Sequence, residues 1–359
     1  MRRSPSRSPP APHSPATIPP PWTATPSAGP GPWWTLRRDV HTAGIATGKH
    51  LAAGHAVRLA TGAPTPLGAT AVIRDEYAVT AKVSGQRVIM RAPGAPMRDD
   101  TRRRGEHWTT GQHLAPAGTR VCPAVVSAAA AAEVTALPVR GPVRANVLLT
   151  GDEIRTHGPL GDGQTRDALG PILPNYLRAC DIRCDHIWHL DDDRDLLRSW
   201  FELSTDADLI VVAGATGRGA ADHLRPLLAE AGARVLIDGV AMRPGGSHLV
   251  AVLPDGRVLL GLPGNPYAAV AALLLTGPAL VDALTARTSR APMWGRIAAG
   301  ITGEITKVLP VRQVPGGVWR TAGPVQTPHL ADLIGCSALA VLRPGTVRGS
   351  LAELLPLPR

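Results

Sequence analysis

Short apolar runs separated by turns dominate residues 33–139. The runs AVRLAT, ATAVIRD, YAVTAKV and QRVIMRAP alternate apolar and polar positions or are rich in β-branched residues. Glycine and proline lie between them, which is typical of short strands joined by turns. A helical pattern first appears at residues 124–136. We therefore predict a mostly β domain over residues 33–139.

Strand-like and helix-like segments alternate over residues 140–287. RANVLLT, IRCDHIWHL, ADLIVVAG and RVLIDG predict strands, whereas residues 171–180, DLLRSWFELS and ADHLRPLLAEAG predict helices. HLVAVL and RVLLGL predict a hairpin with a turn at Asp255-Gly256, and residues 267–275 predict a closing helix. Such alternation is typical of an α/β sheet with helices on both faces.

The two ends of the chain differ from these regions. Residues 1–32 are dense in Pro, Ser and Ala, with too little apolar surface to offset the entropy of ordering, so we predict a disordered tail. Residues 288–359 return to short strands with Gly and Pro between them. The predicted fold class is multidomain α/β plus β, with a central three-layer α/β domain, a flanking β domain and a small C-terminal β domain.

Composition and charge narrow the class of protein. The chain has 359 residues, of which 44% are apolar and only 3% aromatic, so a sizeable core must be built from Ala, Val and Leu. The formal charge is +10, but the Arg residues are scattered, with only short clusters such as residues 102–104. No zinc-finger spacing or aromatic RNA-binding motif accompanies them. Nucleic-acid binding is therefore not expected, while a basic surface for anionic ligands stays open.

No feature favours export or membrane insertion. The N-terminus is basic but lacks an apolar core, and the four cysteines form no C-x-x-C pair. The longest apolar run, residues 268–275, is too short to span a bilayer and meets Gly277-Pro278. We predict a cytoplasmic protein without a membrane partner.

Two acidic turns follow predicted strands. Asp152 and Glu153 end the turn TGDE after RANVLLT, and Asp191, Asp192 and Asp193 follow IRCDHIWHL. In open α/β sheets, ligands bind beyond the carboxyl ends of the strands, where carboxylates can hold a hydrated Mg²⁺ beside a phosphate. On spacing alone, a solvated turn that caps the next helix explains each motif as well.

A Gly-rich turn, VVAGATGRGAAD, follows another predicted strand. Gly214, Gly217 and Gly219 leave backbone N–H groups that could cradle a phosphate at the start of a helix. The spacing is neither a dinucleotide fingerprint nor a Walker motif. Asp222 lies in the first turn of the predicted helix, where complementing the helix dipole is the simpler role.

The turn LPGNP lies between the strand RVLLGL and the closing helix. Asn265 suits the N-cap and Pro266 suits the first helical position. This arrangement predicts unpaired N–H groups that face an open strand end and suit an anion. A tight turn with a good cap is the alternative, and local physics does not separate the two.

The order of these motifs resembles that of the molybdopterin molybdenumtransferase family, which includes MoeA and the gephyrin E domain. TGAP, RRRGE, TGDE, DDD, the Gly-rich turn, RPGG and LPGNP follow one another over about residues 40–345. Each motif alone is weak, whereas TGDE followed by LPGNP at this separation is fairly specific. The family inserts molybdate into adenylated molybdopterin and releases AMP, using Mg²⁺. The resemblance therefore implies a transferase with a molybdopterin-binding α/β domain, which forms a homodimer.

The resemblance also assigns roles to the matching residues. The implied catalytic acids are Asp152, Glu153, Asp192 and Asp222, and the implied metal ligands are Glu153, Asp192 and Asp193. The residues implied to bind the pterin and the nucleotide are Thr61, Gly151, Gly214, Gly219, Pro244, Gly245, Pro263, Gly264, Asn265 and Pro266. Mg²⁺ would polarise the adenylate phosphate.

Several family positions differ in this chain. The DGYA motif of the family is expected before about residue 35, where this chain has a Pro-rich segment. His107 stands in place of the acid of RRxGED, and Gly217 stands in place of the serine of the Gly-rich turn. Two hypotheses stay open: an active molybdenumtransferase, or a catalytically impaired paralogue that binds molybdopterin or a nucleotide.

Overall fold

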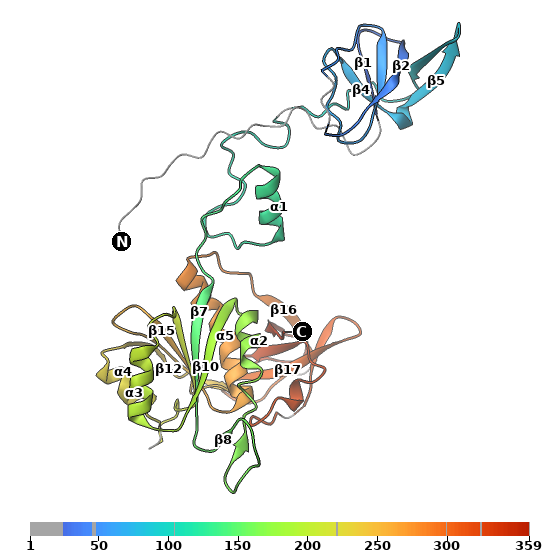
Figure 1. The fold of residues 1–359 in the computed structure, drawn as a ribbon. Coiled ribbons are helices and arrows are strands. Elements are labelled where there is room, and N and C mark those ends of the chain that lie inside the picture. The colour runs from blue at the N-terminus through green and yellow to red at the C-terminus, as the bar shows by residue number, and fades with distance from the viewer. Residues whose placement is uncertain are drawn as a thin grey trace. The chain divides into compact units, whose positions relative to one another are not determined.

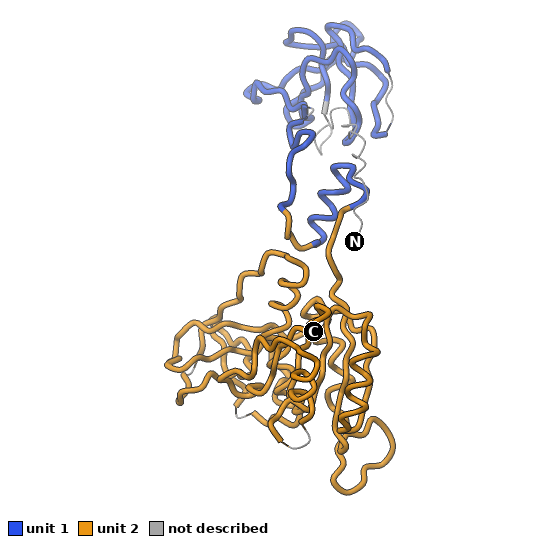
Figure 2. The backbone as a smooth tube through the Cα atoms, turned by 90° about the vertical axis from the view of Figure 1, so that its left-hand side faces the viewer, with its two compact units in different colours: residues 1–116, 121–136 blue, residues 117–120, 137–359 orange. Residues whose placement is uncertain are grey.

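The chain divides into two compact units (Figure 2). One comprises residues 1–116 and 121–136, and the other comprises residues 117–120 and 137–359. The computed structural model describes residues 24–44, 48–103, 105–219, 222–298, 300–323 and 325–358. The first 23 residues of the predicted tail and Arg104 therefore lie outside the described residues.

The first unit is built on a six-stranded sheet in the order β4-β1-β3-β2-β6-β5. Its elements are β1 Ala24–Ser27, β2 Trp33–His41, β3 His55–Leu59, β4 Ala71–Arg74, a 3₁₀ turn Asp75–Tyr77, β5 Ala78–Val83 and β6 Gln86–Arg91. Trp34, Leu36, Ala56, Ile73 and Ile89 form its core. These short strands are the kind that the alternating apolar pattern predicts.

β1 lies inside the segment predicted to be a disordered tail. It pairs with both β3 and β4, and Thr25 and Ser27 are buried. The prediction of disorder is therefore wrong for residues 24–27. The reason is tertiary: two neighbouring strands supply hydrogen bonds that composition alone cannot reveal.

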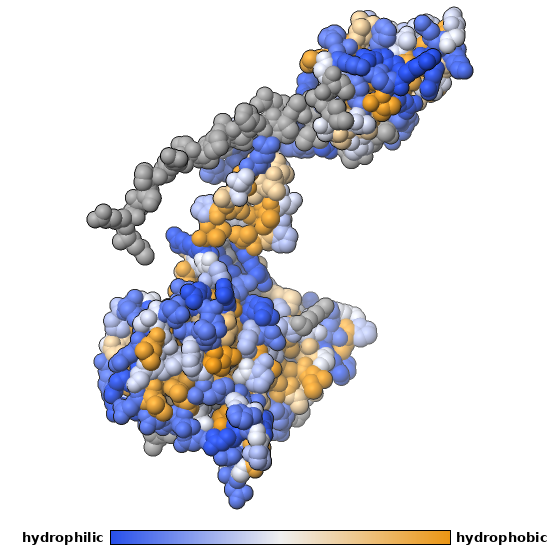
Figure 3. Space-filling model, in the orientation of Figure 1, coloured by the Kyte–Doolittle hydropathy of each residue, from blue (hydrophilic) through white to orange (hydrophobic). Residues whose placement is uncertain are grey.

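Helix α1 (Pro123–Ala131) matches the helical pattern at residues 124–136. Its sequence PAVVSAAAA is apolar, yet none of its residues is buried, and Val126 is 54% exposed. Figure 3 shows apolar side chains on the surface of this helix. The helix is thus not part of the core of its unit.

A second six-stranded sheet forms the centre of the second unit (Figure 1). Its order is β10-β7-β11-β15-β14-β12. β10, β7, β11 and β15 run parallel, whereas β14 is antiparallel to both of its neighbours. The strands are β7 Val143–Thr150, β10 Ile182–Leu190, β11 Leu209–Ala213, β12 Arg234–Asp238, β14 Leu249–Val252 and β15 Val258–Leu262.

Helices cover both faces of this sheet, as Figure 1 shows. Leu148 of β7 joins a core with α3 (Arg194–Leu203) and α4 (Leu224–Glu230). Its neighbour Leu149 joins another core with α2 (Leu173–Ala179) and α5 (Pro266–Thr285). Successive residues of a strand point to opposite faces, so a strand that is buried on both faces is apolar at almost every position. The predicted three-layer α/β arrangement is confirmed.

Helix α5 is longer than the sequence predicted. The apolar run indicated residues 267–275, but α5 has 20 residues and continues through Gly277 and Pro278. An added Cβ at Gly277 would lie 3.1 Å from Cys180 Sγ, so α2 and α5 pack closely there. Within the described part of the chain, α5 is the helix long and apolar enough to cross a membrane, but it packs in the core. Burial of its apolar surface stabilises the helix despite the internal proline.

A third sheet of six strands packs against α5, in the order β13-β17-β18-β16-β20-β19. Val308, Leu339 and Leu355 belong to the same core as α5, and the Tyr267 hydroxyl donates to the Val308 carbonyl oxygen at 2.8 Å. The C-terminal β region thus shares a core with the α/β region. The remaining elements are β8 Ile154–Arg155, β9 Thr165–Arg166, β13 Met242–Arg243, β16 Met293–Ile297, β17 Thr306–Val314, β18 Val318–Thr321, a 3₁₀ turn Ala331–Leu333, β19 Ala338–Leu342 and β20 Leu351–Pro356.

Candidate functional site

The parallel register brings the predicted motifs to one edge of the central sheet. Leu190 at the end of β10 pairs with Thr150 at the end of β7, and Ala213 of β11 pairs with Leu262 of β15. The turns that follow these four strands therefore leave the sheet at the same edge. Antiparallel β14 begins at this edge and β12 ends there, so the turn of residues 239–248 lies there too.

Gly214 is the point where three of these turns meet. Its backbone N–H donates to the Leu262 carbonyl oxygen at 3.0 Å, and an added Cβ at Gly264 would lie 3.7 Å from Gly214 Cα. At Gly214 itself φ is +99°, and an added Cβ would lie 2.5 Å from Thr150 Oγ1. Only glycine combines this conformation with so close an approach. Gly214 therefore holds the ends of β7, β11 and β15 together.

The two acidic turns come together at this edge. The Asp192 backbone N–H donates to Asp152 Oδ1 at 2.9 Å. Asp152 and Glu153 are exposed, and Asp192 is half-buried. Burial raises the pKa of Asp192, and the carboxylates of Asp152 and Glu153 raise it further, although the Thr150 hydroxyl opposes them. A carboxyl group whose pKa is raised by like charges gains stability from a nearby cation.

Asp193 has a structural role next to this cluster. Its side chain caps α3 by accepting from the backbone N–H groups of Asp195 and Leu196, at 2.9 and 2.8 Å. This is the capping alternative that the sequence left open. Its role as a metal ligand stays a prediction.

The donor set at the acidic turns suits Mg²⁺. Among the described residues, no group of three or more His, Cys, Asp or Glu side chains is placed to enclose a metal ion. Mg²⁺, however, commonly takes one or two carboxylates and fills its shell with water and substrate phosphates. Glu153 and Asp192 offer such carboxylates, with Asp152 beside them. The residues present therefore fit a partly hydrated Mg²⁺ rather than a metal enclosed by protein.

Asp222 occupies the cradle that the Gly-rich turn was expected to offer to a phosphate. Its Oδ1 accepts from the Gly217 N–H at 2.8 Å, and its Oδ2 accepts from the Gly219 N–H at 2.6 Å. Helix α4 begins only at Leu224, so Asp222 lies before the helix and not in its first turn. The expectation of an open cradle is wrong for these two N–H groups, because a carboxylate of the chain itself supplies the anion.

Arg225 and Asp238 hold the same turn in place, and sequence reasoning missed their role. Arg225 Nη1 donates to the Gly217 carbonyl oxygen at 2.7 Å, and its Nε donates to Asp238 Oδ1 at 2.7 Å. The Arg225 guanidinium also lowers the pKa of Asp238. The contact joins α4 to the end of β12. No spacing in the sequence signals it, because it exists only once the sheet has formed.

The LPGNP turn begins helix α5 as predicted. The helix starts at Pro266 with Asn265 at its N-cap. The Asn265 side chain makes no capping hydrogen bond, and both it and Gly264 are exposed. The sequence predicted N–H groups open to an anion at this turn. The Tyr267 N–H is not open, because it donates to the Thr327 carbonyl oxygen at 3.2 Å.

The turn that carries Pro244 and Gly245 is fixed to α5 through a buried histidine. His248 is 1% exposed, with Nδ1 2.7 Å from the Gly245 carbonyl oxygen and Nε2 3.3 Å from Thr276 Oγ1. An added Cβ at Gly245 would lie 3.0 Å from the Ala268 carbonyl oxygen. Sequence reasoning missed His248, whose only signal is its place two residues after the RPGG turn.

The remaining predicted residues divide between the two units. Gly151, where φ is +147°, and Pro263 lie in the turns at the sheet edge. Thr61 belongs to the first unit and is exposed in a turn closed by the Ala63 N–H, which donates to the Ala60 carbonyl oxygen at 3.0 Å. It is not among the residues that the second unit brings together, so its ligand role stays a prediction.

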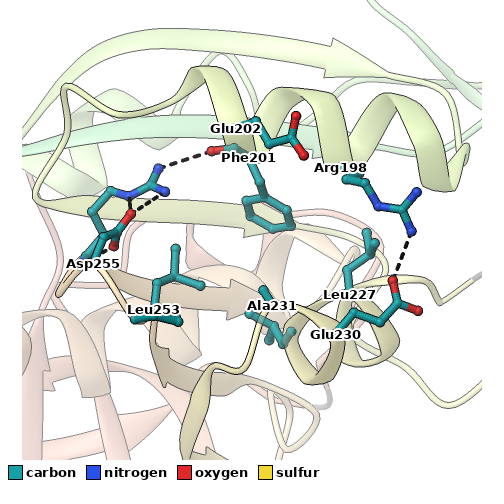
Figure 4. A pocket seen from close by; sticks show the side chains of 11 residues that line it. Arg198, Phe201, Glu202, Leu227, Glu230, Ala231, Leu253 and Asp255 are labelled. Carbon is teal, nitrogen blue, oxygen red and sulfur yellow. Dashed lines mark hydrogen bonds and ion pairs between the residues drawn. The ribbon is translucent and has the colours of Figure 1, made fainter.

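A separate pocket of about 420 Å³ lies at the opposite edge of the sheet (Figure 4). It opens between the ends of α3 and α4 and the β14–β15 hairpin, with the Phe201 ring directed into it. An ion pair between Arg198 and Glu230, at 2.9 Å, closes one side, and Arg257 and Asp255 flank the other. None of the predicted site residues lines it.

Two family models match the chain. One is described as "MoeA N-terminal region (domain I and II)" and matches residues 21–132. The other is described as "Probable molybdopterin binding domain" and matches residues 146–282. The second range contains the acidic turns, the Gly-rich turn and the LPGNP turn.

Curated relatives are named molybdopterin molybdenumtransferase. One from Synechococcus elongatus is 28% identical over 256 residues, which cover 69% of this chain and 62% of that protein. One from Bacillus subtilis is 31% identical over 231 residues, which cover 63% of this chain and 53% of that protein. The chain thus spans about half to three fifths of the length of these relatives.

Solved structures share the fold across almost the whole chain. A molybdopterin biosynthesis MoeA protein from Pyrococcus horikoshii has a TM-score of 0.72 at 16% identity, over 95% of this chain and 87% of that one. Another structure of a molybdopterin biosynthesis MoeA protein from the same organism has a TM-score of 0.68 at 20% identity, over 96% of this chain and 91% of that one. The ordered motifs, both family models and the curated relatives agree, and the chain belongs to the MoeA family.

Proposed function

We propose that the chain is a molybdopterin molybdenumtransferase that inserts molybdate into adenylated molybdopterin and releases AMP in the cytoplasm. The observation that supports this most is the gathering of four strand-end turns at one edge of the central sheet. Gly214 joins three of them, and Asp152 contacts Asp192 beside them. Open α/β sheets bind their ligands at such an edge.

The proposed cofactor is Mg²⁺, held by Glu153 and Asp192 next to Asp152. Burial raises the pKa of Asp192, the carboxylates of Asp152 and Glu153 raise it further, and a divalent cation would relieve this repulsion. When bound there, Mg²⁺ supplies positive charge to the phosphates of the adenylated substrate. The exposed Asn265 amide is free of a capping bond and available to the same substrate.

AMP release from the purified chain tests the proposed activity. The chain is mixed with adenylated molybdopterin, Mg²⁺ and molybdate, and AMP is quantified over time. We expect release that depends on both Mg²⁺ and molybdate, together with molybdenum retained on the pterin. A folded chain that binds the substrate but releases no AMP contradicts the proposal.

A second candidate function is binding of molybdopterin, or of its adenylate, without metal insertion. It is supported by Asp222, whose carboxylate takes the Gly217 and Gly219 N–H groups that would otherwise be open to a phosphate. His107 also stands where the family carries an acid. Tight substrate binding without AMP release supports this second function.

The proposed assembly is a homodimer, as the family resemblance implies. Sedimentation over a range of protein concentrations tests it directly. A chain that stays monomeric at every concentration, with and without substrate, contradicts this part of the proposal.

A further inference from the structure

The loop of residues 151–170 begins with the acidic turn, and hydrogen bonds near its two ends fasten it to β10 and to the turn that follows β10. Near its start, Asp152 Oδ1 accepts from the Asp192 N–H at 2.9 Å. Near its end, Asp167 Oδ2 lies 2.9 Å from His189 Nε2. His189 is on β10 and Asp192 is in the turn that follows this strand. The two contacts therefore join the loop of residues 151–170 to the end of β10 and the turn after it, at two different points.

The surroundings of Asp167 favour this second contact. Its side chain is 6% exposed, and its Oδ1 accepts from the N–H groups of Leu169 and Gly170 at 2.9 and 2.8 Å, which leaves Oδ2 for His189. Burial raises the pKa of Asp167, but these N–H groups and the imidazole outweigh it, and the pKa is lowered overall. Because an ionised carboxylate only accepts hydrogen bonds, His189 Nε2 is the donor.

Backbone hydrogen bonds inside the loop connect Asp167 to the acidic turn. The Thr165 N–H donates to the Glu153 carbonyl oxygen at 2.8 Å, and the Asp167 N–H donates to the Arg155 carbonyl oxygen at 3.0 Å. These bonds continue the β8–β9 pairing, which projects from the sheet edge in Figure 1. Contacts thus run from Glu153 through the ladder to Asp167 and across to His189.

We infer that His189 is a positioning residue that holds the acidic turn in place for the ligand at the sheet edge. The inference rests on the proposed function, because the ligand is the proposed Mg²⁺. With both hydrogen bonds present, Glu153 stays beside Asp192 on a loop that is attached to β10 and to the turn that follows it. Without His189, only the first of these two hydrogen bonds remains. The loop end is still held by Leu169, which is buried in the core, but the loop gains freedom at the position of Glu153.

Two substitutions at His189 and one control on the same strand test the inference. His189→Leu removes the donor and keeps much of the volume, whereas His189→Gln retains an N–H near the position of Nε2. His186→Leu is the control, because His186 is exposed and its ring lies against Trp188, at 5.1 Å between centroids. In the full chain, we expect His189→Leu alone to speed amide exchange in residues 151–170, about tenfold, as the loss of one hydrogen bond implies.

Calorimetry on the full chain with Mg²⁺ as the only ligand measures the affinity for Mg²⁺. It distinguishes a residue that positions the acidic turn for the ion from one that only restrains the loop. We expect the dissociation constant to rise about tenfold in His189→Leu, in the range of a lost outer-shell contact, and to stay within about twofold in the other two variants. Unchanged exchange in His189→Leu overturns the inference, and so does faster exchange with unchanged Mg²⁺ affinity. Absence of AMP release from the wild-type chain contradicts the proposed function but leaves the exchange result as it stands, so the two failures are distinguishable.

Discussion

The edge of the central sheet where β7, β10, β11 and β15 end has two halves that differ in how the negative charge of their carboxylates is compensated. At the ends of β7 and β10, burial raises the pKa of Asp192, and the two neighbouring carboxylates of Asp152 and Glu153 raise it further. At the end of β11, the Asp222 carboxylate accepts from the N–H groups of Gly217 and Gly219. The first half therefore has uncompensated negative charge that favours a cation. The second half is compensated by its own backbone.

The comparison shows that an acidic residue in a strand-end turn has no fixed role. Asp192 has two carboxylates as near neighbours, whereas Asp193, the next residue, caps α3. Asp222 accepts from two backbone N–H groups of the Gly-rich turn. The neighbours of each carboxylate decide whether it can hold a cation, cap a helix or fill an anion cradle.

Asp192→Asn breaks the charged half and has the largest expected effect. We expect AMP release to fall about 100-fold, since loss of a group that stabilises developing charge has effects of this size. Asp195→Asn is the matched control, because that carboxylate is 85% exposed and pairs with Arg198 on α3. Equal rates in the wild type and in Asp192→Asn exclude this carboxylate from the site.

Gly214→Ala disturbs the junction between the two halves. The added Cβ would lie 2.5 Å from Thr150 Oγ1 at a φ of +99°, so we expect the free energy of unfolding to fall by about 2–4 kcal/mol. Gly256→Ala is the control, because its φ is +92° but nothing lies within 4 Å of the added Cβ. Its expected loss is about 1 kcal/mol. Equal losses in urea titrations of the two variants contradict the close approach.

Asp222→Ala removes the carboxylate that accepts from the Gly217 and Gly219 N–H groups in the second half of this edge. We expect a loss of about 1–3 kcal/mol, because two backbone N–H groups lose a charged acceptor. Inorganic phosphate should then raise the melting temperature of the variant more than that of the wild type. A phosphate response identical in both proteins means that the turn does not form an anion cradle when Asp222 is removed.

The smallest expected effect is on the pH dependence of stability. The pKa of Asp192 is raised above its ordinary value of 3.8, so its ionisation destabilises the fold as pH rises through the folded-state pKa. Without Mg²⁺, Asp192→Asn should be slightly more stable than the wild type at neutral pH and equal to it at acidic pH. The pKa of Asp167 is lowered, so its contribution is present at neutral pH and is lost as pH falls below 3.8 through its folded-state pKa. Melting temperatures between acidic and neutral pH check both signs.

The local sequence was sufficient to predict most strands and helices of the second unit. IRCDHIWHL forms β10, DLLRSWFELS lies largely within α3, and the turn at Asp255-Gly256 joins β14 and β15. These segments have a clear apolar period and turn residues at their ends, which are local properties. β1 and the second half of α5 were missed because their stability comes from neighbouring strands and from a shared core.

For the candidate site too, the features that depend on local sequence were predicted and those that depend on tertiary contacts were not. The order of TGDE, the Gly-rich turn and LPGNP placed acids and glycines after strands and indicated the family, because such turns can be read residue by residue. Which carboxylates remain available to a ligand was settled only by the tertiary structure. Asp192 meets Asp152 across two strands, and Asp222 meets Gly217 across a turn. The charge state and the hydrogen-bond partners of a carboxylate depend on what lies within a few ångströms of it, and a one-dimensional sequence does not contain that distance.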